Sequence, residues 1–311
     1  MSPAELQTEA LIPPRLIPGD RVRLVSPASS PGREWLDESI RILKGWELEV
    51  EVGDHVLDQC GYMAGTDEDR LADLNAALRD PGVRAIITTT GGAGAYRIAD
   101  GLDFEAARRD PKPLIGFSDI TNLHLALWRN SKVVSVHGML YGVTGEATRR
   151  AVMTNQPLIL HRNSQDLSAE VSVEGKATGV LLGGHLGTIV YSVGAGLPSL
   201  EGAILFLEAQ VGYGPGVLDE SLFQLVSSGA LNGVRGIAIG HLHRNTDAVA
   251  NDESDGWTVV DVLRDRLGGL GVPILSGLPV GHDPDSMALP LGSTATIDTA
   301  TGSLTVAAGV R

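Results

Sequence analysis

The fold is decided by the stretch PLIGFSD, residues 113–119. Its apolar start predicts a short buried strand, and Gly116 permits the close backbone approach of a sharp turn. The next segment, 120–128, has the apolar spacing of a helix. A serine between a buried strand and a helix is typical of a nucleophile elbow, which exposes the hydroxyl and directs backbone N–H groups at the reacting atoms. Ser118 is therefore the candidate nucleophile, with an ordinary N-cap serine as the alternative.

Around this stretch, the first half of the chain alternates short apolar strands with amphipathic helices. Strands are expected at 21–26, 47–52, 85–89 and 133–136, and helices at 36–46, 67–78 and 95–102. Such alternation predicts an α/β fold with a mostly parallel sheet covered by helices. Ligands are then expected at the carboxyl ends of the strands.

The second half of the chain has a different character. Residues 145–178 are polar, and from Gly179 the chain is glycine-rich and β-prone. Strands are expected at 203–207, 236–240, 273–277, 295–298 and 303–306, with a helix near 218–227. We therefore predict three parts: an N-terminal parallel-sheet domain with the nucleophile (1–150), a linker or loop (151–178) and a β-rich C-terminal α/β domain (179–311).

Composition excludes several classes of protein. The chain has 311 residues, 43% of them hydrophobic, which is enough for a real core, and its formal net charge is −14. This acidic balance argues against a nucleic-acid or membrane partner, since both need a basic surface. Cys60 is the single cysteine, so an internal disulfide is impossible and a reducing compartment fits. With no signal-peptide pattern and no long apolar run, we expect a soluble cytoplasmic protein.

A serine nucleophile needs a base, and the base needs an acid that orients it. His282 follows an apolar run and is flanked by loop residues, which favours a base at a strand end over a turn histidine bonded to backbone. His137 is the rival base, interpreted as structural or substrate-lining, and His124 is expected to pack within its helix. Glu208 ends an apolar strand, where a carboxylate is costly to bury unless it is paired. Glu208 is therefore either a triad acid or a local hydrogen-bond acceptor.

Two further patterns suggest other chemistry. The glycines of segment 91–94 follow a strand, but Arg97 stands where a dinucleotide fingerprint needs glycine. We favour the interpretation that segment 91–94 is a loop whose backbone N–H groups bind an oxyanion. The alternative is a tight turn without a function. His241 and His243, with acidic residues nearby, are expected on one face of a strand and would suit a hydrolytic metal site. A solvated acidic loop is the preferred interpretation there.

Motifs in order along nearly the whole chain resemble a known family. They are LIPGDRV (16–22), GYMAGTD (61–67), the Gly91-Gly92 loop, GFSDIT (116–121), LGG (182–184) and FLE (206–208). Together they resemble the LD-carboxypeptidases of the serine peptidase S66 clan, which also contains the microcin C self-immunity hydrolases.

The resemblance implies a two-domain cytoplasmic serine hydrolase, a homodimer with its site in the cleft between domains. It implies Ser118 as nucleophile, Glu208 as orienting acid and His282 as general base. The implied oxyanion hole consists of the backbone N–H groups of Gly92 and Asp119. No metal or cofactor is expected, and the implied partner is a small peptide or peptide conjugate.

Departures from the family pattern concern the substrate. The muropeptide enzymes usually carry arginine and tyrosine where this chain has Thr90 and Ala93, and family members often carry asparagine where His185 stands. The immunity hydrolases stack a nucleotide on a tryptophan of the interdomain loop, but residues 163–178 contain no aromatic residue. Residues 283–286 also differ from the usual segment rich in glycine and asparagine.

Three hypotheses follow. The first is a serine carboxypeptidase that cleaves a terminal L,D-peptide bond in cell-wall fragments and releases D-alanine. The second is an amidase that detoxifies peptidyl or aminoacyl nucleotides, against which the missing loop aromatics count, since stacking is worth about 1–3 kcal/mol per base. The third is a catalytically silent binding protein, which the retained triad residues disfavour.

Overall fold

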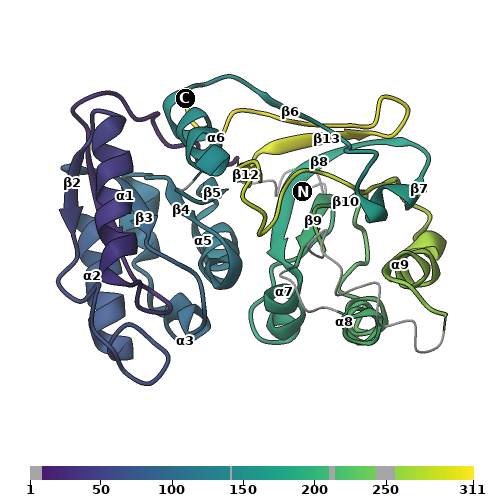
Figure 1. Ribbon diagram of the computed structural model, residues 1–311, viewed down its shortest axis with the longest axis horizontal. Coiled ribbons are helices and arrows are strands. Elements are labelled where there is room, and N and C mark those ends of the chain that lie inside the picture. The colour runs from purple at the N-terminus through teal and green to yellow at the C-terminus, as the bar shows by residue number, and fades with distance from the viewer. Residues whose placement is uncertain (1–8, 141, 210–213, 243–255) are drawn as a thin grey trace, which may run out of the picture.

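The computed structural model describes residues 9–140, 142–209, 214–242 and 256–311. They form two α/β units that lie side by side, the first built mainly from the first half of the chain (Figure 1). This confirms the predicted fold class, a parallel-sheet unit followed by a β-rich α/β unit. No helix in these ranges is long and apolar enough to cross a membrane.

The first sheet has six strands in the order β12-β5-β4-β3-β1-β2. The strands are β1 (Arg21–Val25), β2 (Glu49–Val52), β3 (Val83–Thr88), β4 (Leu114–Gly116), β5 (Ser135–His137) and β12 (Leu289–Leu291). The strands from β1 to β5 pair in parallel, as the alternation predicted. In contrast, β12 comes from the other half of the chain and pairs antiparallel with β5.

Helices cover both faces of this sheet. They are α1 (Arg33–Gly45), α2 (Asp67–Arg79), α3 (Ala95–Ile98), α4 (Phe104–Arg109), α5 (Thr121–Ser131) and α6 (Gly142–Met153). Successive strand residues point to opposite faces. Accordingly, Ile86 lies in one core cluster with residues of α2 and α5, whereas Ile87 lies in another with residues of α1 and α6.

The second sheet has eight strands in the order β6-β14-β13-β8-β9-β10-β11-β7. They are β6 (Leu158–His161), β7 (Ser172–Val173), β8 (Lys176–His185), β9 (Ala203–Glu208), β10 (Gly236–Ile239), β11 (Ile274–Leu275), β13 (Thr294–Asp298) and β14 (Ser303–Val306). The central strands β8 to β11 are parallel and the outer ones antiparallel. Helices α7 (Leu186–Ser192), α8 (Pro215–Ser227) and α9 (Val259–Leu267) pack on one face.

The opposite face of the second sheet packs against the first unit. Leu289 and Leu291 of β12 share a core cluster with Leu181 of β8 and Phe206 of β9. The two units are therefore joined by side-chain packing as well as by the chain. Residues 151–178 contain the end of α6, the strands β6 and β7 of the second sheet, and the first residues of β8. The sequence patterns did not predict β6, β7, β8 or β12, nor the helices α4, α6, α7 and α9.

Candidate active site

The backbone at Ser118 has an unusual conformation. Strand β4 ends at Gly116, a short 3-10 turn covers Ser118–Ile120, and α5 follows directly, so the predicted strand, turn and helix are present. Ser118 has a φ of 60°, a left-handed value shared by only two other non-glycine residues in the described part of the chain. Such a conformation costs roughly 1–3 kcal/mol and persists where the surrounding structure enforces it. The strain therefore marks Ser118 as a candidate functional residue.

Glycines on both sides of Ser118 make this turn feasible. A Cβ at Gly116 would lie 2.3 Å from Thr88 Oγ1, and a Cβ at Gly91 would lie 2.8 Å from the Cβ of Ser118 itself. Only glycine fits at such distances. The Gly91-Gly92 loop after β3 therefore lies directly against the serine, as the oxyanion-loop hypothesis requires.

The loop and the serine turn are tied together by Asp119. Its buried carboxylate accepts a hydrogen bond from the N–H of Ala95 at 2.8 Å and another from the side chain of Asn122 at 2.9 Å. Burial raises the pKa of Asp119 and outweighs these hydrogen bonds, which act to lower it. Among described residues, no acceptor lies opposite the N–H of Gly92 or that of Asp119. Both residues line the cavity at Ser118, as the predicted oxyanion hole requires.

The acid and the base meet at the edge of the second sheet. Glu208 ends β9 and is completely buried, and its Oε2 lies 2.7 Å from Nδ1 of His282. Burial acts to raise the pKa of Glu208, but the hydrogen bond from His282 and the charges of nearby imidazoles hold it below its ordinary value. The carboxylate is therefore ionised at neutral pH, and it orients the imidazole with Nδ1 as the donor.

The imidazole of His282 lies against the serine turn. Nε2 is buried and has no partner among described residues. The ring contacts the ring of Phe117, the residue before Ser118, with centroids 5.2 Å apart, and the ring of His185 at 5.6 Å. His185 lines the same cavity as Ser118. The structure thus brings the three predicted triad residues to one place, from the turn after β4, the end of β9 and the segment before β12.

The other histidines near the site lie beneath it. His137 is buried with Nε2 3.7 Å from Glu208 Oε1, and burial lowers its pKa to about 4 despite the charge of Glu208. His124 contacts the carbonyl of Gly116 through Nε2 at 3.0 Å, and burial lowers its pKa to about 3. Neither lines the cavity at Ser118. His137 therefore packs against the acid instead of facing the serine, which disfavours it as the rival base.

A cavity of about 370 Å³ opens from Ser118 between the two units. One wall is a face of α5, formed by Asn122, Leu125, Ala126 and Arg129. The opposite wall comes from the end of β8 and from α7, and includes His185 and Tyr191. Tyr96 and Asp100 of the first unit complete its rim. Sequence reasoning did not single out Arg129, Tyr96 or Tyr191. The residues of the α5 wall follow Asn122 at spacings of three, four and seven, and residues at these spacings share one helix face. This pattern in the sequence could have indicated the wall.

The polar stretch considered as a substrate loop lies elsewhere. In the part of the chain that the structure describes, no residue of 163–178 lines the cavity at Ser118. This stretch includes β7, which pairs with β11 on the far side of the second sheet. The absence of an aromatic residue there therefore says nothing about whether this cavity can stack a base.

Of the two histidines considered as metal ligands, His241 lies among the described residues and His243 does not. His241 lies beyond the end of β10, so its predicted place on a strand is wrong. His241 Nδ1 is 2.7 Å from Asp283 Oδ2, and its Nε2 is 3.8 Å from Asp166 Oδ2. The contact with Asp283 attaches the loop that carries His282 to the end of β10, and the contact with Asp166 attaches the segment before Leu167 there.

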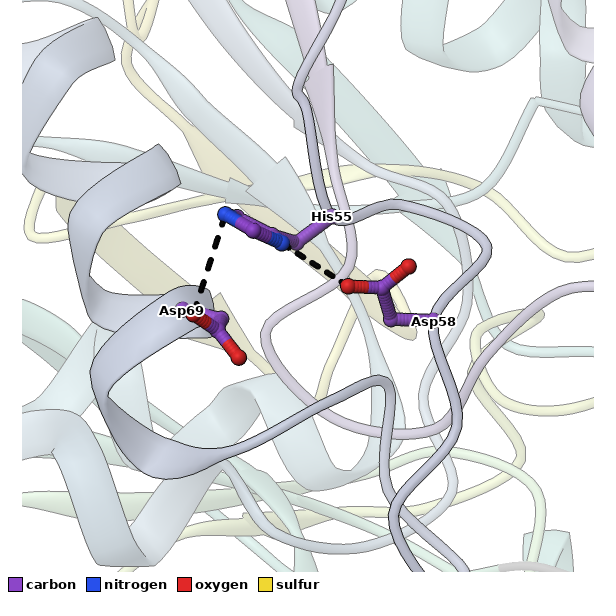
Figure 2. Close-up of side chains that lie close together, drawn as sticks. All are labelled: His55, Asp58 and Asp69. Carbon is purple, nitrogen blue, oxygen red and sulfur yellow. Dashed lines mark hydrogen bonds and ion pairs between the residues drawn. The ribbon is translucent and has the colours of Figure 1, made fainter.

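A second group of possible metal ligands lies at the start of α2. Figure 2 shows His55 between Asp58 and Asp69, with ligand atoms that all lie within 4.8 Å of one another. His55 Nδ1 is 2.8 Å from Asp58, and this hydrogen bond raises the pKa of His55. Asp69 also closes the capping box of α2 with Thr66. The cluster is thus explained by the helix N-terminus and its ion pairs.

Comparisons with known proteins agree with this geometry. Residues 22–138 match the model of the LD-carboxypeptidase N-terminal domain, and residues 178–297 match that of the LD-carboxypeptidase C-terminal domain. A putative carboxypeptidase of Streptomyces coelicolor is 36% identical, with 96% of each chain covered. A probable murein peptide carboxypeptidase of Bacillus subtilis is 34% identical, covering 96% of this chain and 95% of its own.

Solved structures show the same fold. The crystal structure of an MccF-like protein from Bacillus anthracis superposes with a TM-score of 0.84 at 26% identity. The superposition covers 96% of this chain and 100% of that one. The two-unit arrangement is therefore shared over the whole length of that protein.

Proposed function

Because the chain belongs to the LD-carboxypeptidase family, and is thus an enzyme of the carboxypeptidase class, we propose that it acts through a Ser118–Glu208–His282 triad. The proposed reaction cleaves the terminal L,D-peptide bond of a cell-wall tetrapeptide and releases D-alanine. The observation that carries the triad is the buried Glu208–His282 pair packed against the strained turn of Ser118. The named murein peptide carboxypeptidase among the relatives supports the substrate class.

The proposed reaction has two halves. Ser118 Oγ attacks the carbonyl carbon of the scissile bond while Nε2 of His282 takes the hydroxyl proton. The oxyanion of the tetrahedral intermediate accepts hydrogen bonds from the N–H groups of Gly92 and Asp119. When the intermediate collapses, the C–N bond breaks and His282 gives the proton to the amine of D-alanine. Water, activated by the same imidazole, then hydrolyses the acyl-enzyme and frees Ser118.

Glu208 has an electrostatic role in this scheme. The imidazolium that forms during each half-reaction would be costly in a buried site without a partner. The ionised carboxylate 2.7 Å from Nδ1 stabilises that charge and holds the ring with Nε2 toward the serine. The lowered pKa of Glu208 keeps the carboxylate charged throughout.

A three-substrate assay tests the proposal. The enzyme is offered an L,D-tetrapeptide, the all-L tetrapeptide and glutamyl sulfamoyl-adenosine, and each product is quantified by mass spectrometry. We expect D-alanine from the first substrate alone. Labelling of Ser118 by a fluorophosphonate, abolished in Ser118→Ala, tests the nucleophile separately. Turnover of the nucleotide conjugate alone would reject the carboxypeptidase substrate but leave the triad standing.

One observation supports the second candidate, an amidase for peptidyl or aminoacyl nucleotides. Tyr96 and Tyr191 line the cavity, with exposed fractions of 54% and 80%, so the site has aromatic rings on which a base can stack. The likeness to an MccF-like protein is in keeping with this candidate. Loss of nucleotide turnover in Tyr191→Ala would support it.

We further propose that the enzyme is a cytoplasmic homodimer with three parts, 1–150, 151–178 and 179–311. A single exposed cysteine, Cys60, suits a reducing compartment. The family models match residues 22–138 and 178–297, one on each side of the middle part. Light scattering on the purified chain measures the oligomeric state, and a monomer at micromolar concentration would reject the dimer.

A further inference from the structure

We propose that Arg129, at the end of the cavity away from Ser118, binds a carboxylate on the acyl part of the substrate. This inference rests on the proposed carboxypeptidase reaction and specifies the substrate that the cavity accepts. It assigns to the enzyme a preference for peptides that carry an acidic group several bonds before the cleaved bond.

The positive charge of Arg129 in the cavity favours the binding of an anionic group. Arg129 is the only lysine or arginine among the described residues that line it, in a chain whose net charge is −14. Its side chain is 30% exposed, so the guanidinium is partly desolvated but open to the cavity. A cation in such a place attracts an anionic group more strongly than a cation on the open surface.

The guanidinium is held in place while donors remain free. Nη1 donates to the carbonyl of Gly196 at 2.5 Å, and Nη2 pairs with Asp100. A Cβ at Gly196 would lie 2.4 Å from Nη1, so the loop packs directly on the arginine. A guanidinium has more N–H donors than these two acceptors use, and its planar fork matches a carboxylate. The side chain of Asp100 is 80% exposed, so solvent weakens its hold on the guanidinium.

Helix α5 determines how far this group lies from the reaction. Ser118 lies in the turn before α5, which begins at Thr121, and a rise of 1.5 Å per residue places Arg129 about 12 Å along the helix from that start. Side chains lean toward the helix N-terminus, which brings the guanidinium somewhat closer to the serine. The carboxylate of the released residue lies within about one residue length, ~3.8 Å, of the scissile bond. Arg129 is too distant to hold it.

The acyl part of the substrate is therefore what reaches Arg129. An extended chain covers about 3.3–3.6 Å per residue, so the arginine meets a group roughly two to three residues before the bond, or the end of a branch there. Between the two ends the wall is apolar at Leu125 and Ala126, which suits the body of a peptide. A free carboxylate on the acyl part satisfies both the distance and the charge.

The test measures binding without turnover. In a Ser118→Ala background, dissociation constants are determined by calorimetry for L-Ala–γ-D-Glu–L-Lys–D-Ala and for the same peptide with the glutamate α-carboxylate amidated. A hydrogen bond to a charged group is worth about 1.5–3 kcal/mol, so we expect about 10- to 150-fold weaker binding of the amide. Adding Arg129→Gln should abolish this ratio, whereas Arg129→Lys should keep part of it.

Arg108→Gln is the matched control. Arg108 also donates to a backbone carbonyl, that of Asn130 beside Arg129, but it does not line the cavity. This variant should keep the full preference for the carboxylate. Equal binding of the two peptides to Ser118→Ala, binding of neither, or an unchanged ratio in Arg129→Gln would each overturn the inference. Failure of the wild-type enzyme to release D-alanine would instead reject the proposed function, because the binding ratio does not depend on turnover.

Discussion

Nδ1 of His282 and Oε2 of Glu208 lie 2.7 Å apart, although 74 residues separate them in the chain. The carboxylate is buried at the end of β9, and the imidazole is held on a loop that His241 and Asp283 attach to the end of β10. The pair is thus fixed by the second sheet, whereas the serine turn belongs to the first. The geometry of the proposed triad therefore depends on how the two units pack.

Replacing Ser118 separates its chemical role from its backbone strain. Ser118→Ala should lower kcat by about 10⁶, the loss typical of a triad nucleophile. Ser118→Gly should lose as much activity but melt higher than Ser118→Ala, since glycine adopts a φ of 60° without strain worth about 1–2 kcal/mol. Steady-state kinetics and thermal melts measure both effects. Equal melting temperatures would show that the turn is not strained.

Glu208→Gln should remove the charge that stabilises the imidazolium while keeping a side chain of the same shape. We expect kcat to fall by about 10⁴ with little change in KM, because the interaction strengthens only as the proton moves. His137→Gln, which replaces the other imidazole next to the Glu208 carboxylate, is assayed for comparison. A variant of Glu208 that kept a tenth of the wild-type kcat would contradict its role as orienting acid.

Gly91→Ala should inactivate the enzyme because the added methyl group would collide with the turn that carries Ser118. The new methyl group would lie 2.8 Å from the Cβ of Ser118 and 3.1 Å from the carbonyl of Phe117, so the turn must shift. Gly45→Ala, at the end of α1, meets nothing within 4 Å and should leave kcat unchanged. Activity assays on the two variants give a direct comparison, and normal activity of Gly91→Ala would exclude tight packing of the loop on the serine.

Stability should fall on acidification below neutral pH. Burial lowers the pKa of His124 to about 3 and that of His137 to about 4, from an ordinary value of 6.5. Between these values the unfolded chain binds more protons than the folded one, so the free energy of unfolding decreases as the pH falls. At pH 5 the loss is about 2 kcal/mol for each histidine.

Urea unfolding at pH 7.5 and pH 5 measures this loss. His124→Gln keeps a donor for the carbonyl of Gly116 but removes one titrating group, so the loss should shrink by about 2 kcal/mol. His161→Gln, at an exposed position of β6, should not change it. The Glu208 carboxylate, with its lowered pKa, adds stability that is lost only below its ordinary value of 4.5, outside this range. The same loss in His124→Gln as in the wild type would refute the assignment.

The serine turn could be predicted because the residues that form it are neighbours in the sequence. An apolar strand, a glycine and a helical segment stand next to one another in the sequence, and strand β4 and helix α5 lie where these patterns indicated. The strand end at Glu208 was visible in the same way, whereas the expected strand end at His282 is wrong, because β11 ends at Leu275 and His282 lies in a loop. The family resemblance then supplied the roles that spacing alone left open.

The rest of the site depends on contacts between distant segments. Tyr191 lies on α7, a helix that the glycine-rich, β-prone sequence around it did not indicate, and it reaches the cavity only because α7 packs opposite α5. Strand β12 has three residues with Pro290 in the middle, a pattern that argues against a strand unless it forms a sheet edge. It does form the edge of the first sheet, paired with β5.

The position of β12 also bears on the order of events during synthesis. The sheet that presents Ser118 is completed by Leu289–Leu291, and His282 stands only seven residues before this strand. A nascent chain that has emerged only as far as the first unit leaves β5 as an open edge and contains neither Glu208 nor His282 of the proposed triad. Under the proposed mechanism, such a chain has the serine but neither the acid nor the base. The proposed site is therefore complete only after the segment with His282 and β12 has been synthesised.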